Sequence, residues 1–462
     1  MKVTGLYVYP VKALRGIAMP TAELGPQGIR YDRRFMLLTK KRSKKQTLAK
    51  MQLSSFPECA LFSQEIVDAK AAGESPASDG DKVVVVHYHP PEKGENGERG
   101  VAGGDSSASK VSDSNRIVMS PVQHPPLRIP LNPSYGSLQP LDVNLHGSPA
   151  RGYRMGDPYD AWFSACFGFD VVLVYIGDGQ RKVLGDALKL GVHLPKKKTT
   201  KTNAEKNAHA ASPPNNSLFA LVLTYVVGAC LALLAALGLR RKTQEKPDEP
   251  WIAFSDCAPF LVTAESSLRN VSARMSEGVE VPMYKFRPNI VVDGEGEEEW
   301  AEDYWGELTV TRGNASQEAS APSTPSLSRS RSTSSLASLA LTSASSATAV
   351  TPDKETPTGP VRLLLTSNCA RCTSLNVDYS TGTRAAGELG EVLKRLAKDR
   401  RVDPGTKYSP VFGRYAFLDQ RGGAKSLDDD DEEDGVVQIS VGNEVAVTRR
   451  NAERTVWDWP DL

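Results

Sequence analysis

The chain has no excess of charge of either sign. Its 462 residues include 56 Lys plus Arg and 55 Asp plus Glu, which gives a formal net charge of +1. Proteins that bind nucleic acid usually carry a basic surface that attracts phosphates, so nucleic acid is not an expected partner. Residues 1–16 also lack the apolar core of a signal peptide, because they mix apolar and polar residues as strands do. We expect no cleavable secretion signal.

Cysteine is scarce as well, with six residues and no regular spacing. This excludes a disulfide framework and favours reduced thiols in an intracellular compartment. Cys369 and Cys372 form the one closely spaced pair, within TSNCARCTSLNVDYSTG. A structural zinc site would need four ligands, and the sequence has neither a second C-x-x-C nor an H-x3-H motif. A thioredoxin-like pair would open a helix, whereas residues 373–383 favour a strand and a turn.

Several segments have the pattern of strands or helices. We predict strands at the N-terminus (MKVTGLYVYPVK), at residues 34–39 (RFMLLT) and at residues 82–89 (KVVVVHYH). DPYDAWFSACFG predicts a helix, and VVLVYIG after it predicts a buried strand. His87 and His89 alternate on one strand as a metal pair would, but two exposed histidines at a strand end are the simpler interpretation. Residues 69–115 otherwise predict long loops.

Residues 218–239, LFALVLTYVVGACLALLAALGL, form a long uncharged and mostly apolar run. At ~1.5 Å of rise per residue its length is close to that of the bilayer core, so it predicts a transmembrane helix. A buried core helix is the alternative, although globular helices of this length usually have a polar face. Lysines before the run and Arg240, Arg241 and Lys242 after it nearly balance, so charge does not orient it.

Two further segments have biased composition. Residues 312–360 are dominated by Ser, Ala and Thr around SRSRSTSS, and they predict a disordered insert. Residues 428–434, DDDDEED, lack the spaced ligands and Gly of a calcium loop, so we interpret them as an acidic loop before the last strand.

Four sets of motifs, in order, resemble one family. LYVYPVKALRG and GIRYDRRFMLLTK are similar to the N-terminal β-barrel that precedes MOSC domains, and IAFSDCAPFLVTAESSL and FRPNIVVDG resemble its middle. NCARCTSLNVDYSTG, YSPVFGRYAFLD and ISVGNEVAV resemble the MOSC domain of the mitochondrial amidoxime-reducing component and its bacterial relatives. The resemblance covers most of residues 1–62, 157–177, 251–311 and 361–449.

The resemblance implies a mainly β fold with some α. We expect an N-terminal MOSC-type β-barrel domain at 1–187, a linker at 188–250 that contains the membrane segment, a MOSC domain at 251–449 and a tail at 450–462. The loops at 69–115 and the Ser-rich stretch at 312–360 are then insertions into these domains.

The resemblance also assigns a site. In that family the second cysteine of the motif ligates molybdenum, which implies that Cys372 is the metal ligand and the catalytic residue. The implied contacts to the molybdenum cofactor, a molybdopterin with a phosphate, are Lys12, Arg33, Asp256, Cys257, Arg287 and Asn289. Ala13 stands where the family usually has Ser, and Cys257 replaces the usual Thr. Thiolate is a soft ligand, and Lys and Arg are the residue types that bind phosphate.

The implied activity is a molybdenum-dependent reductase that removes oxygen from N-hydroxylated substrates such as amidoximes and hydroxylamines. No haem or flavin motif is evident, so electrons would come from cytochrome b5 and its reductase, the partners that the family uses. Two alternatives remain. One is a non-redox cofactor or sulfur-carrier protein, although the desulfurase domain of molybdenum-cofactor sulfurases has no counterpart here. The other is a membrane-tethered binding module without activity.

The apolar run conflicts with a shared site, because a single span would separate Lys12 and Arg33 from Cys372. The run could instead dip into or lie along one leaflet, be absent from the mature chain, or span a protein that has no composite site. Its flanks are linker-like, as expected of an insertion. We expect a membrane-associated intracellular protein, at the mitochondrial outer membrane or an endomembrane.

Overall fold

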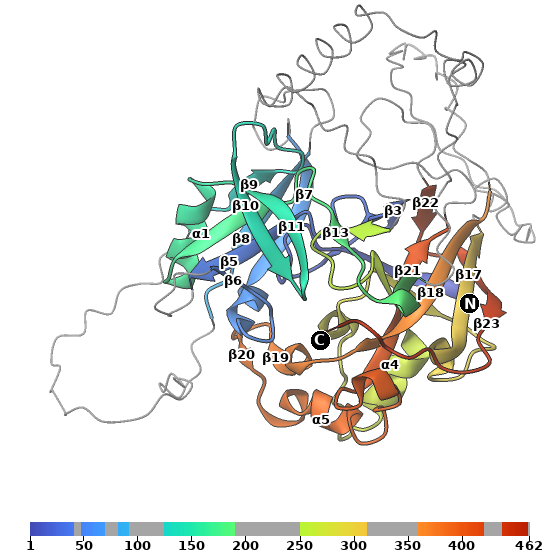
Figure 1. Cartoon of the computed structure of the whole chain (residues 1–462). Helices are drawn as coiled ribbons and strands as arrows, with labels where there is room; N and C mark the ends of the chain where they lie inside the picture. The colour runs from blue at the N-terminus through green and yellow to red at the C-terminus, as the bar shows by residue number, and fades with distance from the viewer. Residues whose placement is uncertain are drawn as a thin grey trace, which may run out of the picture. The chain divides into compact units, whose positions relative to one another are not determined.

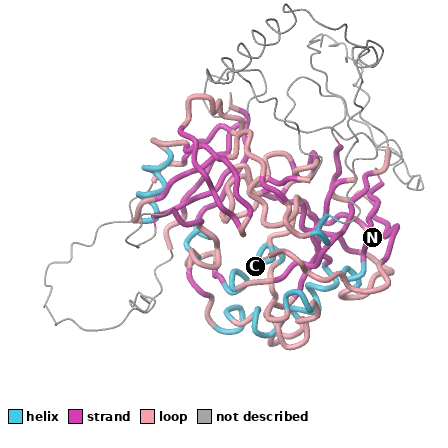
Figure 2. The backbone as a smooth tube through the Cα atoms, viewed as in Figure 1, coloured by secondary structure: helices cyan, strands magenta, loops and turns pink. Residues whose placement is uncertain are grey.

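The computed structural model describes residues 1–40, 48–69, 82–91, 124–189, 250–311, 359–419 and 437–460. Strands dominate this part of the chain, and the helices are short (Figure 2). Residues 1–193 and 251–462 form one compact unit. The apolar run at 218–239, the centre of the Ser-rich insert and the acidic loop all lie outside the described residues.

The largest sheet closes into a barrel. Its order is β16-β15-β21-β18-β17-β23-β1-β2, and β1 also pairs with β16, so all its strands except β2 form a closed ring. Strands β15 and β16 are parallel, and the other pairs in the ring are antiparallel. The bounds are β1 Lys2–Val8, β2 Ile17–Ala18, β15 Phe260–Ala264, β16 Ile290–Asp293, β17 Trp305–Thr311, β18 Val361–Ala370, β21 Val411–Leu418 and β23 Glu444–Arg450.

The ring takes its first strand from the N-terminus and the rest from residues 260–450. Strand β1 alternates buried and exposed positions at its start, as a strand with one apolar face does. Val3, Leu6 and Val8 join a core whose other members include Trp305 and Leu363. The domain boundaries proposed from the sequence remain predictions, but this barrel draws strands from both sides of residues 188–250.

A second set of sheets surrounds another core. One has the order β10-β11-β12-β5-β6, and another β7-β8-β9. A separate sheet joins β22 to β3 and β4, and its buried residues belong to the core of the closed ring. The bounds are β3 Thr21–Gly25, β4 Gly28–Ile29, β5 Phe35–Lys40, β6 Leu48–Lys50, β7 Phe62–Asp68, β8 Lys82–Tyr88, β9 Leu127–Pro130, β10 Gln139–Leu145, β11 Ser148–Arg154, β12 Val171–Tyr175 and β22 Val437–Ser440. The short pairs are β13 Arg181–Lys182 with β14 Trp251–Ile252, and β19 Val377–Asp378 with β20 Thr383–Arg384.

Local sequence explains these elements. Strand β12, VVLVY, is rich in β-branched valine, and all of its residues are buried. It pairs with β5 in the middle of its sheet. Helix α1, Tyr159–Phe167, packs on β12 and ends at Gly168, which adopts the left-handed conformation with φ 76° (Figure 1). The predictions of strands at β1, β5, β8 and β12 and of helix α1 are confirmed.

The remaining helices are short. They are α2 Asp186–Lys189, α4 Glu265–Ser272 and α5 Val392–Leu396, with 3-10 helices η1 Pro57–Leu61, η2 Met283–Phe286, η3 Ala301–Tyr304, η4 Thr373–Asn376, η5 Gly387–Gly390 and η6 Pro404–Thr406. The prediction that a strand follows the cysteines directly is wrong at 373–376, because η4 precedes β19. Within the described ranges no helix is long and apolar enough to cross a membrane.

Candidate active site

One cleft brings together residues from distant parts of the chain. The space inside it that the centre of a water molecule can occupy is about 120 Å³. Its lining comes from residues 12–13, 33, 52–54, 256, 258, 260–261, 286–287, 289, 369–372, 374 and 415. We call Lys12, Arg33 and Arg287 the cationic wall, and Cys369, Arg371 and Cys372 the thiol wall. Both walls line the same cleft.

Lys12 is buried at the end of the N-terminal strand segment. Its backbone N–H donates to the Phe35 carbonyl at 2.8 Å, beside the bridge between Val11 and Phe35. Its Nζ donates to the Phe254 carbonyl at 2.9 Å and to Asp256 Oδ1 at 2.5 Å. Burial lowers the pKa of Lys12 to about 8, although Asp256 opposes this effect. The ammonium is therefore held in place by a carbonyl and a carboxylate at the edge of the cleft.

Arg33 has a left-handed backbone with φ 51°. Its Nη1 donates to Asp32 Oδ2 and, at 3.2 Å, to Asn289 Oδ1, and its guanidinium lies 4.6 Å from the centre of the Tyr9 ring. Burial alone would lower the pKa of Arg33, but the Asp32 carboxylate raises it above its ordinary value. Asn289 also uses its amide on the backbone of Leu261 and Tyr7. It therefore orients Arg33 and has little capacity left for a ligand.

Arg287 has a less complete set of partners. It follows η2 in the left-handed conformation with φ 56°, and its guanidinium lies 4.4 Å from the centre of the Tyr9 ring. Its Nη1 is buried and has no hydrogen-bond partner among the described residues. A buried donor without a partner is costly, so this group is available to an acceptor on a bound molecule.

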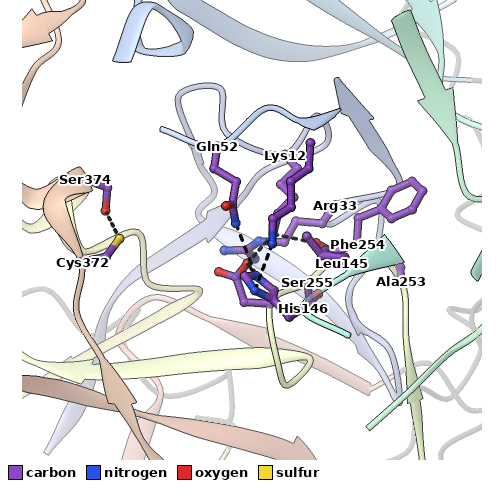
Figure 3. Close-up of polar contacts among 12 residues, drawn as sticks. Lys12, Arg33, Gln52, Leu145, His146, Ala253, Phe254, Ser255, Cys372 and Ser374 are labelled. Carbon is purple, nitrogen blue, oxygen red and sulfur yellow. Dashed lines mark hydrogen bonds and ion pairs between the residues drawn. The ribbon is translucent and has the colours of Figure 1, made fainter. Parts of the chain in front are cut away.

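The two cysteines of the pair differ in their surroundings. Cys369 lies at the end of β18 and is buried, and its Sγ accepts from Arg371 Nη1 at 3.1 Å. Cys372 is exposed at the start of η4, and its Sγ lies 3.2 Å from the Ser374 hydroxyl oxygen. Figure 3 shows Cys372 and Ser374 across from the group that contains Lys12 and Arg33. Cys372 is thus the thiol that a bound metal can reach.

Arg371 separates these cysteines and is buried. Its Nη2 donates to the Phe286 carbonyl at 2.7 Å, and its backbone N–H donates to the Pro410 carbonyl at 2.8 Å. Its Nε has no partner among the described residues. Burial would lower the pKa of Arg371, but Cys369, Cys372 and nearby Tyr415 raise it. The sequence analysis missed Arg371 and Tyr415, although the position of Arg371 inside the motif was a signal for it.

Asp256 and Cys257 are adjacent but differ in exposure. The Asp256 side chain lines the cleft and is 46% exposed. Burial would raise the pKa of Asp256, but Lys12 and His146 hold it well below its usual range. Cys257 is buried in a cluster with Cys369 and Trp457, outside the cleft lining, and burial raises the pKa of its thiol well above the ordinary value. Its predicted cofactor contact stays a prediction.

The loop that carries Asp256 is fixed by Arg181, which the sequence did not single out. This fully buried guanidinium donates to the carbonyls of Ala253, Ser255 and Asp256 at 3.1, 2.5 and 3.3 Å, and to Leu145 at 2.8 Å. Burial lowers its pKa to about 10. Arg181 therefore sets the loop geometry without entering the cleft.

The donor set of the cleft fits a phosphate-bearing cofactor with a metal. The cleft is cationic, because its lining contains one carboxylate, Asp256, and four cationic side chains, those of Lys12, Arg33, Arg287 and Arg371. Arg287 and Arg371 each keep a buried donor without a partner. Cys372 adds one accessible soft ligand. Among the described residues, those of the cleft included, no group of three or more His, Cys, Asp or Glu residues could hold a metal ion by itself.

Family models match both parts of the chain. The model of the MOSC N-terminal β-barrel domain matches residues 1–86, and that of the MOSC domain matches residues 249–334 and 337–446. The chain is a MOSC-domain protein. Of the residues predicted from the sequence to bind the cofactor, six line the cleft of this MOSC-domain protein: Lys12, Arg33, Asp256, Arg287, Asn289 and Cys372.

Curated relatives of this MOSC-domain protein are distant. It is 28% identical over 178 residues to human mitochondrial amidoxime-reducing component 1, and this match covers 38% of the chain and 36% of the human protein. It is 27% identical over 178 residues to bovine mitochondrial amidoxime reducing component 2, which covers 38% of the chain and 37% of that protein. The matched part thus spans little more than a third of these relatives.

Proposed function

We propose that this MOSC-domain protein binds a molybdenum cofactor and reduces N-hydroxylated compounds of the amidoxime and hydroxylamine type. The observation that carries the proposal is the exposed thiol of Cys372 in the same cleft as the cationic wall. The similarity to amidoxime-reducing components supports the substrate class.

Each wall has its own part in this proposal. Cys372 would ligate the metal, while Lys12, Arg33 and Arg287 would hold the phosphate and the pterin. Asp256 would orient Lys12, and Asn289 would orient Arg33. When bound, the cofactor supplies the two-electron oxygen chemistry, and the protein positions and tunes it.

The overall reaction requires a source of electrons. Converting an N-hydroxyl group into N–H and water consumes two electrons and two protons. We propose that the electrons come from a separate protein system, cytochrome b5 and its reductase, on the strength of the family resemblance. The protons come from solvent.

We also propose that the protein associates with an intracellular membrane through residues 218–239, at the mitochondrial outer membrane or an endomembrane. Lys12, Arg33 and Cys372 line one cleft, so their segments must share a compartment. This supports a segment that dips into or lies along one leaflet, or that is removed, over one that spans. Protease protection on sealed vesicles tests it, and cleavage near residues 100 and 330 from opposite sides would contradict it.

The deciding experiment for the function is metal and molybdopterin analysis of the purified full-length protein, followed by an assay with an aromatic amidoxime and a reduced dye. We expect bound molybdenum and conversion of the amidoxime to the amidine. Bound cofactor without turnover would favour the non-redox carrier function. Protein without molybdenum after expression in a cofactor-producing host would favour an inactive binding module.

A further inference from the structure

His146 lies outside the cleft lining but belongs to the same hydrogen-bond network as Lys12, as Figure 3 shows. It occupies the turn between β10 and β11, where Leu145 pairs with Ser148. Both turn residues have positive φ, 57° at His146 and 76° at Gly147. Two-residue hairpins of this kind favour Asn-Gly, and a histidine here is strained. Such strain points to a use for the side chain.

The contacts of the imidazole define its tautomer. Nδ1 lies 3.2 Å from Lys50 Nζ, and Nε2 lies 3.3 Å from Asp256 Oδ1 and 3.3 Å from Gln52 Nε2. An ammonium can only donate, so Nδ1 accepts from Lys50. Nε2 then carries the proton and donates to the Asp256 carboxylate. The Gln52 amide nitrogen is also a donor, so it makes no hydrogen bond with Nε2 in this tautomer. The backbone of the turn is also held, since the His146 carbonyl accepts from Trp459 Nε1 at 2.7 Å.

Asp256 transmits this constraint to Lys12. The same oxygen, Oδ1, contacts both His146 and Lys12. Arg181 fixes the backbone of Asp256, but the carboxylate is half exposed and would otherwise rotate toward solvent. Lys12 has three N–H donors. Phe254 and Asp256 take two of them, which leaves one for the cleft that Lys12 lines.

We propose that His146 is a positioning residue, which acts through Asp256 to aim the remaining donor of Lys12 at an anionic group bound in the cleft. The inference rests on the proposed function only in taking that anion to be the cofactor phosphate. The charged groups that face His146 are Lys50, Asp256 and Lys12. A proton added at Nδ1 would point at the Lys50 ammonium, so the network works with a neutral ring.

The test measures binding of sulfate, a dianion whose charge does not change near neutral pH, by calorimetry. It uses full-length protein made in a host that does not produce the cofactor, so that no cofactor phosphate competes with sulfate. His146→Asn is the informative variant, because Asn tolerates the left-handed turn conformation better than His. The hairpin should therefore keep its stability. We expect sulfate affinity to fall by about tenfold, the loss of one charge-assisted hydrogen bond. Affinity equal to that of the wild type would overturn the inference.

A double-mutant cycle separates positioning from a general effect on the fold. Lys12→Ala should weaken sulfate binding, and adding His146→Asn to it should weaken binding no further, because the effect runs through Lys12. Additive losses would contradict the inference. His87→Gln is the matched control, since His87 pairs with Glu65 near the partly exposed end of β8, and it should bind sulfate like the wild type.

Ring nitrogen NMR gives a readout that a purely structural role would not move. We expect Nδ1 of His146 to be unprotonated and Nε2 protonated at neutral pH, and the reverse tautomer would overturn the inference. Wild-type protein that binds no sulfate would also overturn it. If the protein binds sulfate but contains no molybdenum when it is purified from a cofactor-producing host, the proposed function fails. The role of His146 stands in that case.

Discussion

The cationic wall and the thiol wall of the cleft are held in different ways. On the cationic wall, Lys12 is paired with Asp256, and Arg33 is paired with Asp32 and Asn289. On the thiol wall, Arg371 holds Cys369, while Cys372 stays exposed beside the Ser374 hydroxyl. The cationic wall therefore has positive charges held in place by protein carboxylates, and the thiol wall has an accessible sulfur atom at Cys372. Such preorganisation reduces the cost of binding.

The largest expected effect separates the two cysteines of the thiol wall. Cys372→Ser should abolish amidoxime reduction, because it removes the exposed thiol that would ligate the metal. Cys369→Ser should keep a substantial fraction, since Cys369 is buried against Arg371. Turnover and molybdenum content, measured side by side on both variants, check this. Equal loss of activity with molybdenum retained in each would refute the assignment of Cys372.

The next effect concerns the support of the cationic wall. Arg181→Ala would leave several buried carbonyls without a donor, and we expect the free energy of unfolding to fall by about 3 kcal/mol. Denaturant titration measures it. Arg128→Ala, at an exposed position of β9, is the control and should change stability little. If both variants unfold alike, Arg181 does not hold the Asp256 loop.

A smaller effect follows from the charge on Lys12. Its pKa is lowered to about 8, so the ammonium is present below that pH and is lost as the pH rises through it. Sulfate affinity should drop by about tenfold between pH 7 and pH 9.5. Lys12→Arg keeps its charge over this range, so its sulfate affinity should stay flat there. A wild-type profile without a step near pH 8 would mean that Lys12 does not contact the anion.

The smallest effect is expected far from both walls. Strands β17 and β18 pair directly, with Val310 opposite Val361, so the ends of the Ser-rich insert lie close together. Deleting residues 317–355 should therefore leave the melting temperature and molybdenum content unchanged. Differential scanning calorimetry checks this. A fall of several degrees would show that the insert packs against the barrel.

Much of this arrangement could be predicted from the sequence. Period-two and β-branched patterns identified β5, β8 and β12, and the motifs pointed to Lys12, Arg33 and Cys372 as members of one site. His146 and Arg181 could not be identified in this way, because they act through long-range contacts to the loop at residues 253–256. For Cys257 the motif predicted a cofactor contact, but the position in the motif does not reveal that the side chain is directed into an apolar cluster. The 3-10 helix η4 was missed because its residues favour strands and turns.

The place of β1 in the closed ring has a consequence for biosynthesis. Leu6 pairs with Ile290, so β1 is synthesised long before this partner strand, and its earlier pairing is the short one with β2 at Tyr7 and Val8. At about 5 to 20 residues per second, the wait is roughly 15 to 60 seconds. During this time an apolar strand edge remains open to wrong partners. Residues 251–462 made alone would therefore lack the strand that closes the ring between β16 and β23.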